Sequence, residues 1–240
     1  MRVGIFIDGY NLYYGGESLI GKRTSGWRWL DMRSLFSKIA TTHWPTMTVA
    51  APIVYCTSRI KGDPAAHKRQ DDYIRALVKS SSVDVVEYGN FIAKAKVRPI
   101  GEETKTGKTR ILPAVHPVFV KDAQGADSPG AYLMVSVSDR EEKGSDVNVA
   151  AHLLIEALEG RIDAAIVVSN DSDLSFAVKE ARRRVPVGVV NPNRKPTAAK
   201  LKKHPTDGPG GHWEYQLVAS DWTAHQLSDP CAGITKPPTW

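Results

Sequence analysis

The sequence predicts an α/β fold: a three-layer α/β/α sandwich around a central, mostly parallel sheet. Residues 3–7 form a continuous apolar run, which is typical of a strand buried on both faces. Further apolar runs recur along the chain, and segments with apolar residues at helical spacing lie between them. Alternation of strands and helices is the pattern of a parallel sheet covered on both faces.

The N-terminal part predicts the element order βαβαβ. Residues 3–7 are the expected central strand, and Asp31 is a suitable cap for a helix that ends near Thr42. Residues 48–56 are the second strand. Pro64 begins a helix that ends near Lys79, because proline is favoured in the first helical turn, and residues 83–88 form the third strand.

The sequence from residue 91 onward predicts an inserted segment, the remaining strands of the sheet and a C-terminal extension. Residues 91–130 are expected to form a hairpin or arm inserted into a main domain of residues 1–190. Residues 191–240 form a basic, Pro/Gly-rich extension that packs back on the domain. The other expected elements are a strand at 132–137, a helix capped by Ser145 or Asp146, a strand at 163–169, a helix at 174–184 and a closing strand at 185–190.

Length and composition limit the classes of protein to which this chain can belong. With 240 residues, 42% of them hydrophobic, the chain can build one main core. No stretch approaches the ~20 apolar residues of a membrane span, and residues 3–7 are too short for a signal peptide. Cys56 and Cys231 are too few for a disulfide framework. These observations predict a cytoplasmic protein with free thiols, and they are compatible with a homo-oligomer.

The charge distribution favours a polyanionic partner. The formal net charge is +6 and the pI is near 9.2. Residues 182–203 carry no acidic residue, and a charge run of this kind is either a solvated face or a phosphate-contacting surface. The basic residues of this run are Arg182, Arg183, Arg184, Arg194, Lys195, Lys200, Lys202 and Lys203. From position 194 onward we expect them to contact the phosphates of a nucleic acid.

Four aspartates, Asp8, Asp146, Asp171 and Asp173, stand where strands end or helices begin. Any one of them alone is more often a helix cap or turn former. Together they predict a cage for one or two Mg²⁺ or Mn²⁺ ions, because neighbouring carboxylates need a cation to remain ionised. Such a site suits metal-assisted phosphodiester hydrolysis, and Lys143 is placed either to neutralise a phosphate or simply in a solvated loop.

The motifs together resemble the NYN domain, a branch of the PIN-like nuclease superfamily. They are Asp8 with Asn11 three residues later, the segment KGSDV at 143–147, and the segment SNDSD at 169–173. The resemblance extends from residue 2 to about residue 190, and the segments HQLSDP and KPPTW are similar to the end of some bacterial members.

The resemblance implies a metal-dependent ribonuclease, specifically an endoribonuclease. It implies that Asp8, Asp146, Asp171 and Asp173 are metal ligands or orient water, that Asn11 is a polar pocket residue, and that Ser169 orients the acidic pair. His152 stands where many members have a further acid. It is either a core histidine or a pocket hydrogen-bond donor, and its presence bears on whether two metals bind.

Three alternatives accompany this hypothesis. A haloacid-dehalogenase-type phosphatase is excluded because Tyr10 stands where its second aspartate is needed. An RNA-binding or assembly protein with little turnover remains an alternative, as does a DNA flap or single-strand nuclease, because the same pocket cuts either backbone. RNA is the favoured partner, through the resemblance.

Overall fold

The computed structural model describes residues 1–106, 108–112, 121–128, 130–204, 206–238 and 240. The chain divides into two compact units: Met1–Phe91 with Glu142–Trp240, here called unit 1, and Ile92–Glu141, here called unit 2. The predicted arm at 91–130 includes residues 107, 113–120 and 129, which lie outside the described residues.

Unit 1 is built on a six-stranded sheet with the strand order β10-β9-β8-β1-β2-β3. All neighbouring strands pair in parallel, and Ile5 of β1 lies between Ile53 of β2 and Ile166 of β8. The predicted α/β class with a parallel central sheet is therefore confirmed. The strands are β1 Arg2–Asp8, β2 Val49–Thr57, β3 Val85–Tyr88, β8 Ala164–Val168, β9 Val187–Asn191 and β10 Trp213–Gln216.

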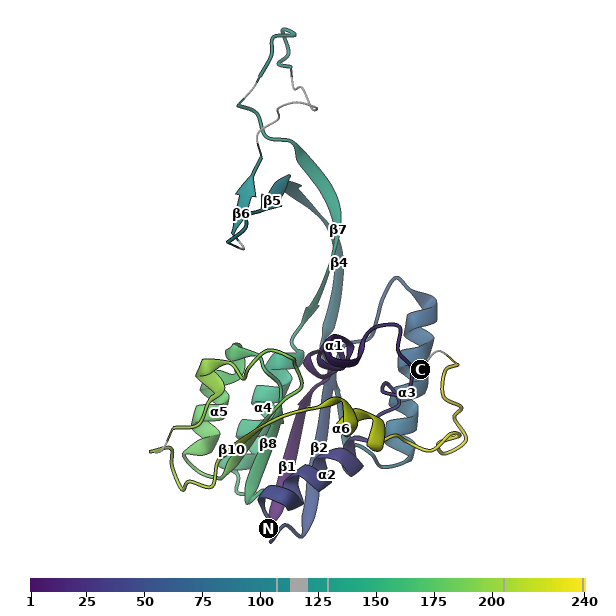
Figure 1. Ribbon diagram of the computed structural model, residues 1–240, viewed down its shortest axis with the longest axis vertical. Helices are drawn as coiled ribbons and strands as arrows, with labels where there is room; N and C mark the ends of the chain where they lie inside the picture. The colour runs from purple at the N-terminus through teal and green to yellow at the C-terminus, as the bar shows by residue number, and fades with distance from the viewer. Residues whose placement is uncertain (107, 113–120, 129, 205, 239) are drawn as a thin grey trace. The chain divides into compact units, whose positions relative to one another are not determined.

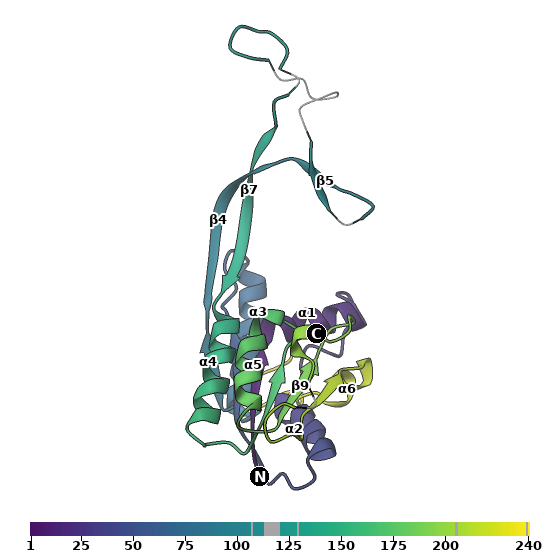
Figure 2. The same cartoon turned by 90° about the vertical axis from the view of Figure 1, so that its left-hand side faces the viewer.

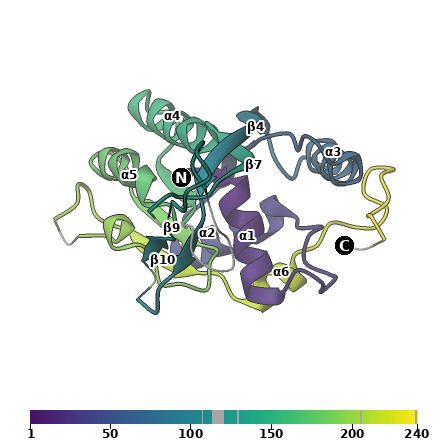
Figure 3. The same ribbon diagram turned by 90° about the horizontal axis from the view of Figure 1, so that it is seen from above.

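Helices cover both faces of this sheet (Figures 1 and 3). On one face, α4 Ser145–Leu158 and α5 Ser175–Arg182 pack on side chains such as Phe6 and Val167. On the other face, α1 Gly9–Ile20, α2 Met32–His43, α3 Pro64–Lys79 and α6 Ala219–Ala224 share a second hydrophobic cluster with Ile5 and Ile166. Because β1 alternates its side chains between the two clusters, it is buried on both faces, as its apolar run predicts.

Aspartates start three of these helices. The side chain of Asp8 accepts from the backbone N–H of Asn11 at the start of α1. Asp31 caps α2 and Asp63 caps α3 in the same way, and Pro64 occupies the first turn of α3. Each side-chain oxygen satisfies a backbone donor that the helix itself leaves unpaired.

The structure differs from the predicted elements in three places. Helix α1 was not predicted, because its two consecutive glycines, Gly15 and Gly16, weaken the helical pattern. Residues 185–190 do not close the sheet, since β10 of the C-terminal extension adds an edge strand beside β9. The cap of α4 is Gly144, whose φ of 91° lies in the left-handed region that favours glycine.

In its described residues, unit 2 contains two small sheets of two strands each. Strand β4 Asn90–Pro99 pairs with β7 Met134–Lys143, and Figure 2 shows the two strands side by side. Strand β5 Gly101–Glu103 pairs in antiparallel register with β6 Thr109–Ile111.

The described part of the chain contains no helix that is both long enough and apolar enough to cross a membrane.

Candidate functional site

The candidate site lies at the carboxyl ends of β1 and β8. These neighbouring strands are where the sheet order reverses, since the chain continues from β1 towards β2 and β3 on one side and from β8 towards β9 and β10 on the other. Open α/β sheets bind ligands at this switch point. A pocket of about 360 Å³ is found here, lined by Asp8, Tyr10, Asn11, Tyr14, Glu142, Lys143, Gly144, Ser145, Asp146, Asp171 and Asn193.

Asp8 lines this pocket, and only 5% of its surface is exposed. Its Oδ1 accepts from Asn11 N at 3.0 Å, and its Oδ2 accepts from Ser169 Oγ at 3.0 Å. Burial raises the pKa of Asp8 to about 6; the two hydrogen bonds act in the opposite direction, while the charges of Asp171 and Glu142 raise it further. Asp8 is therefore placed to gain or lose a proton near neutral pH.

The hydroxyl of Ser169 links Asp171 to Asp8. It accepts from the backbone N–H of Asp171 at 3.1 Å and donates to the Asp8 carboxylate. The side chain of Asp171 caps the short helix η1 Ser172–Leu174 by accepting from Asp173 N at 2.9 Å. Asp173 itself is exposed and does not line the pocket. The structure thus brings Asp8, Asp146 and Asp171 together in one pocket and leaves Asp173 at its outside.

Asn11 joins two loops to the start of α1 at this edge. Its Oδ1 accepts from Asn170 N at 3.0 Å and from Asn193 Nδ2 at 2.9 Å. Asn170 in turn accepts from Ala198 N at 2.7 Å through its Oδ1. Asn11 therefore holds the segment after β8 and the segment after β9 against the start of α1.

Glu142 is a pocket residue that the sequence did not reveal. Its Oε1 accepts from Ser58 Oγ at 2.9 Å and from Ser145 N at 3.1 Å. It lies directly before the KGSDV segment, within a run of charged residues at 139–143. Because all five residues of this run are charged, the sequence does not distinguish Glu142 as a site residue. Asn193 was likewise missed, although it follows the carboxyl end of β9 where site residues are expected.

Two tyrosines of α1 form the aromatic wall of the pocket. Tyr10 and Tyr14 lie one helical turn apart with ring centroids 6.2 Å from each other, and Tyr14 is 56% exposed. The Tyr10 hydroxyl donates to Ser58 O at 3.2 Å. Burial, with smaller contributions from Glu142 and Tyr14, raises the pKa of Tyr10 to about 12, so this hydroxyl is a neutral donor. These tyrosines were not predicted as site residues because helix α1 was not predicted.

The predicted metal cage is not formed by the described side chains. Among them, no three His, Cys, Asp or Glu residues lie close enough together to hold a metal ion. Both oxygens of Asp8 and one oxygen of Asp171 accept hydrogen bonds within the protein. The metal-binding assignment is therefore unsupported, and the Mg²⁺ or Mn²⁺ cofactor stays a prediction.

His152 and Lys143 occupy different positions. His152 is half-buried on α4 with its Nε2 3.4 Å from Glu87 Oε2, and it does not line the pocket. Lys143 is exposed and does line the pocket.

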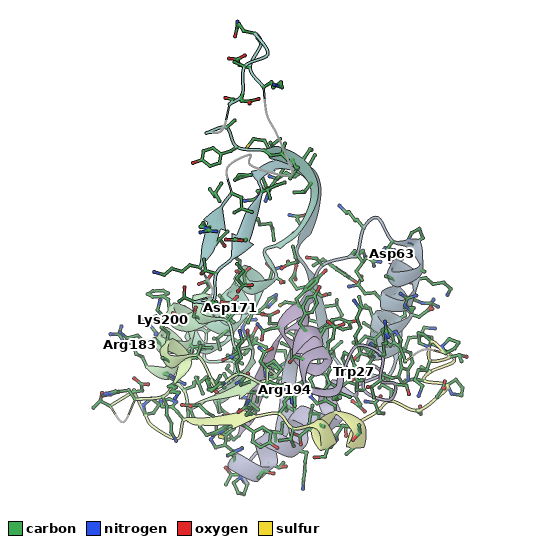
Figure 4. The ribbon with its side chains drawn as sticks, turned by 45° about the horizontal axis from the view of Figure 1, so that its top comes forward. Trp27, Asp63, Asp171, Arg183, Arg194 and Lys200 are labelled. Atoms are coloured by element: carbon green, nitrogen blue, oxygen red, sulfur yellow. The ribbon has the colours of Figure 1, made fainter. Side chains whose placement is uncertain are left out.

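The basic run is mostly on the surface. Arg194 and Lys195 lie in the loop after β9, Lys200 lies in the short helix η2 Ala199–Leu201, and Lys202 and Lys203 follow it; all five are exposed. Figure 4 labels Arg194, Lys200 and the earlier Arg183. Arg182 differs, because it is buried and donates to Leu201 O and Lys202 O, so it holds the loop rather than a phosphate. A nucleic-acid partner for the exposed residues stays a prediction.

Comparison with known proteins gives one informative relative. No protein-family model matches the chain. The 6-hydroxy-3-succinoylpyridine 3-monooxygenase HspA of Pseudomonas putida is 26% identical over 254 residues, which cover 100% of this chain and 75% of the relative. A solved structure of a protein of unknown function from Vibrio parahaemolyticus covers 92% of this chain and 94% of its own, with 14% identity and a TM-score of 0.44. At that TM-score, the likeness supports no inference about function.

The similarity to a monooxygenase corrects the predicted chemistry. It points to an oxidative enzyme, so the predicted metal-dependent endoribonuclease, a hydrolase, is wrong, and the alternatives of a DNA nuclease or an RNA-binding protein with little turnover fall with it. The physical reason is that a parallel sheet delivers carboxylates to its carboxyl edge whatever reaction takes place there. The strand-end aspartates located a site but did not define its reaction.

Proposed function

We propose that the protein is an oxidoreductase of the monooxygenase type, acting on a small, planar nitrogen heterocycle bound in the pocket of Asp8 and Tyr14. The observation that carries this proposal is the similarity to HspA, which extends over the whole of this chain. The name of that relative denotes a substrate with a pyridine ring. The pocket volume of about 360 Å³ is at the small end for ligand sites and suits a single ring with substituents.

The pocket lining supports a substrate of this kind. Tyr10 and Tyr14 offer ring faces for stacking against a planar ligand. Four carboxylates, those of Asp8, Glu142, Asp146 and Asp171, outnumber the one ammonium group of Lys143. This excess favours a ligand that presents N–H or O–H donors, or a protonated ring nitrogen, towards the acidic side.

Asp8 supplies a group for proton transfer. A carboxyl group with a pKa near 6 exists in both protonation states close to neutral pH, so it can take a proton from a ring hydroxyl or return one. Tyr10 remains a neutral hydroxyl, and Ser169 fixes the orientation of the Asp8 carboxylate.

The overall reaction needs an electron donor. Monooxygenation consumes the substrate, O₂, two electrons and two protons, and it yields the oxygenated product and water. A dinucleotide does not fit this edge of the sheet in the usual way. β1 ends at Asp8 and leads directly into α1 at Gly9 without a Gly-x-Gly-x-x-Gly turn, and the carboxylates would repel a pyrophosphate. We therefore assign no step to a bound dinucleotide here.

The test uses labelled oxygen. The full chain is incubated under ¹⁸O₂ with a reduced nicotinamide or reduced flavin and either a set of hydroxypyridines or 6-hydroxy-3-succinoylpyridine, and products are analysed by mass spectrometry. We expect one ¹⁸O atom in the product. Tyr14→Ala and Asp171→Asn should lower kcat/KM at least about tenfold, whereas Asp63→Asn, at the cap of the distant helix α3, should not. Absence of ¹⁸O incorporation with every donor and substrate would contradict the proposal.

A further inference from the structure

Unit 2 lacks a hydrophobic core within its described residues. No residue of unit 2 whose side chain the structure describes is buried. Six large apolar side chains are instead exposed, between 37% and 63% each: Val97, Ile100, Ile111, Tyr132, Met134 and Val137. An isolated two-stranded ribbon is at best marginally stable in water, and three or more strands are needed for independent stability.

The two edges of the β4–β7 ribbon differ in charge. Strand β4 carries Lys94, Lys96 and Arg98 at alternate positions, and charged side chains of this kind protect an edge against pairing with another strand. Strand β7 is uncharged over its first five residues, 134–138, and its charged residues begin only at Asp139. In the two-stranded sheet, the far side of β7 has no neighbouring strand among the described residues. Of the two unpaired edges, that of β7 is therefore the one without charged residues at its N-terminal half.

We propose that β7 pairs with β7 of a second copy of this chain, in antiparallel orientation about a two-fold axis at Ser136. The uncharged segment 134–138 has its centre at this residue. Pairing about Ser136 sets Met134 opposite Ser138 and Val135 opposite Val137. A two-fold interface of this kind is self-complementary, and it turns two ribbons into one four-stranded sheet.

The charges of the paired segment fit a second copy. With Ser136 opposite itself, position 139 pairs with position 133 and position 140 with position 132, and neither Leu133 nor Tyr132 is charged. Unit 2 carries eight basic and six acidic residues, a balance that suits a protein partner better than a nucleic acid.

Cysteine cross-linking tests the register of this pair. Opposed residues of an antiparallel pair have Cα atoms about 4.5–5.5 Å apart, within the range of a disulfide. We expect Ser136→Cys to form a cross-linked dimer on mild oxidation of the full chain. Both native cysteines are buried free thiols and should not interfere. Lys94→Cys is the matched control, because β4 and its copy would be separated by three strand spacings, about 14 Å.

The oligomeric state tests the interface itself. We expect the wild-type chain to be a dimer in sedimentation velocity, and Ser136→Asp, which opposes two carboxylates, to raise the dimer Kd more than about tenfold. Ser136→Asn, of similar size without the charge, should remain dimeric. A wild-type monomer at all concentrations would overturn the proposal. So would a dimer that persists in Ser136→Asp, or equal cross-linking of the Ser136→Cys and Lys94→Cys chains.

Discussion

Asp8 combines three roles in one side chain. It ends β1, it caps α1 through Asn11 N, and it presents a buried carboxylate to the pocket beside Asp171 and Glu142. The cap and the Ser169 hydrogen bond hold its geometry, while burial works against its ionisation. Residues with such opposing demands are typical of functional sites, where stability is lowered for the sake of chemistry.

We expect Asp8→Asn to remove a component of the pH dependence of stability. The pKa of Asp8 is raised from 3.8 to about 6 in the folded chain, so ionisation costs more there than in the unfolded chain. This cost is absent below pH 4, grows as the pH rises and is complete above pH 6, where it amounts to on the order of 2–3 kcal/mol. Asparagine keeps the cap without the charge.

The measurement is urea unfolding of both chains between pH 4 and pH 8. The variant should gain stability relative to the wild type as the pH rises through this range. Asp63→Asn, at the cap of α3, is the control for changing a capping carboxylate to an amide. A wild-type-minus-variant difference that is constant with pH would contradict the expected burial cost.

At the scale of elements, α1 and the segment after β9 fix the shape of the pocket together. Helix α1 approaches the backbone of Pro192 so closely that a Cβ at Gly15 would lie 2.4 Å from its carbonyl oxygen. The same contact places Asn193 within hydrogen-bond distance of Asn11. Gly15 and Gly16, which weaken the helical pattern of α1 in the sequence, are therefore the residues that allow the helix to pack closely on its neighbours.

We expect Gly15→Ala to destabilise the protein by up to about 2 kcal/mol. Alanine improves helix propensity by about 1 kcal/mol, but the added methyl group meets backbone, and overpacking of this kind costs about 1–3 kcal/mol or more. Chemical denaturation gives the free energy of unfolding. Gly130→Ala, where a Cβ meets nothing within 4 Å, should change it by less than about 0.5 kcal/mol. Stabilisation by Gly15→Ala would show that the helix moves freely away from Pro192.

At the scale of the whole molecule, the two units differ in how they are stabilised. Both hydrophobic clusters are composed only of residues of unit 1. The chain leaves unit 1 after β3 and re-enters it at Glu142, and these points are close, since a Cβ at Gly89 would lie 2.6 Å from Lys143 O. Unit 1 therefore has its own core and closely spaced ends for the insertion.

We expect unit 1 to fold when residues 92–141 are replaced by a short Gly/Ser linker. Because no core residue is lost, the shortened chain should unfold cooperatively, with a free energy within about 1–2 kcal/mol of the main transition of the full chain. Near-ultraviolet circular dichroism and urea unfolding provide the measurement. Under the proposed β7 pairing, the shortened chain should also be monomeric. A chain without cooperative unfolding would show that unit 1 depends on unit 2.

The sequence by itself determined the class of fold and the edge of the sheet at which the site lies. Buried parallel strands are recognisable as apolar runs, and caps such as Asp31 and Asp63 act over three residues, so both signals are local. For the same reason, Asp8 and Asp171 could be placed at strand ends before their distance in space was known.

Only the tertiary structure decided which residues share the pocket. Tyr14, Glu142 and Asn193 come from three distant segments, and they meet because α1 packs on Pro192 and β7 returns beside Ser58. The sheet likewise recruits β10 from the C-terminal extension, through pairing with β9 that no local pattern indicates. These features depend on long-range packing, in which each contact is favourable only once the others are formed, and a local reading of the sequence does not contain that information.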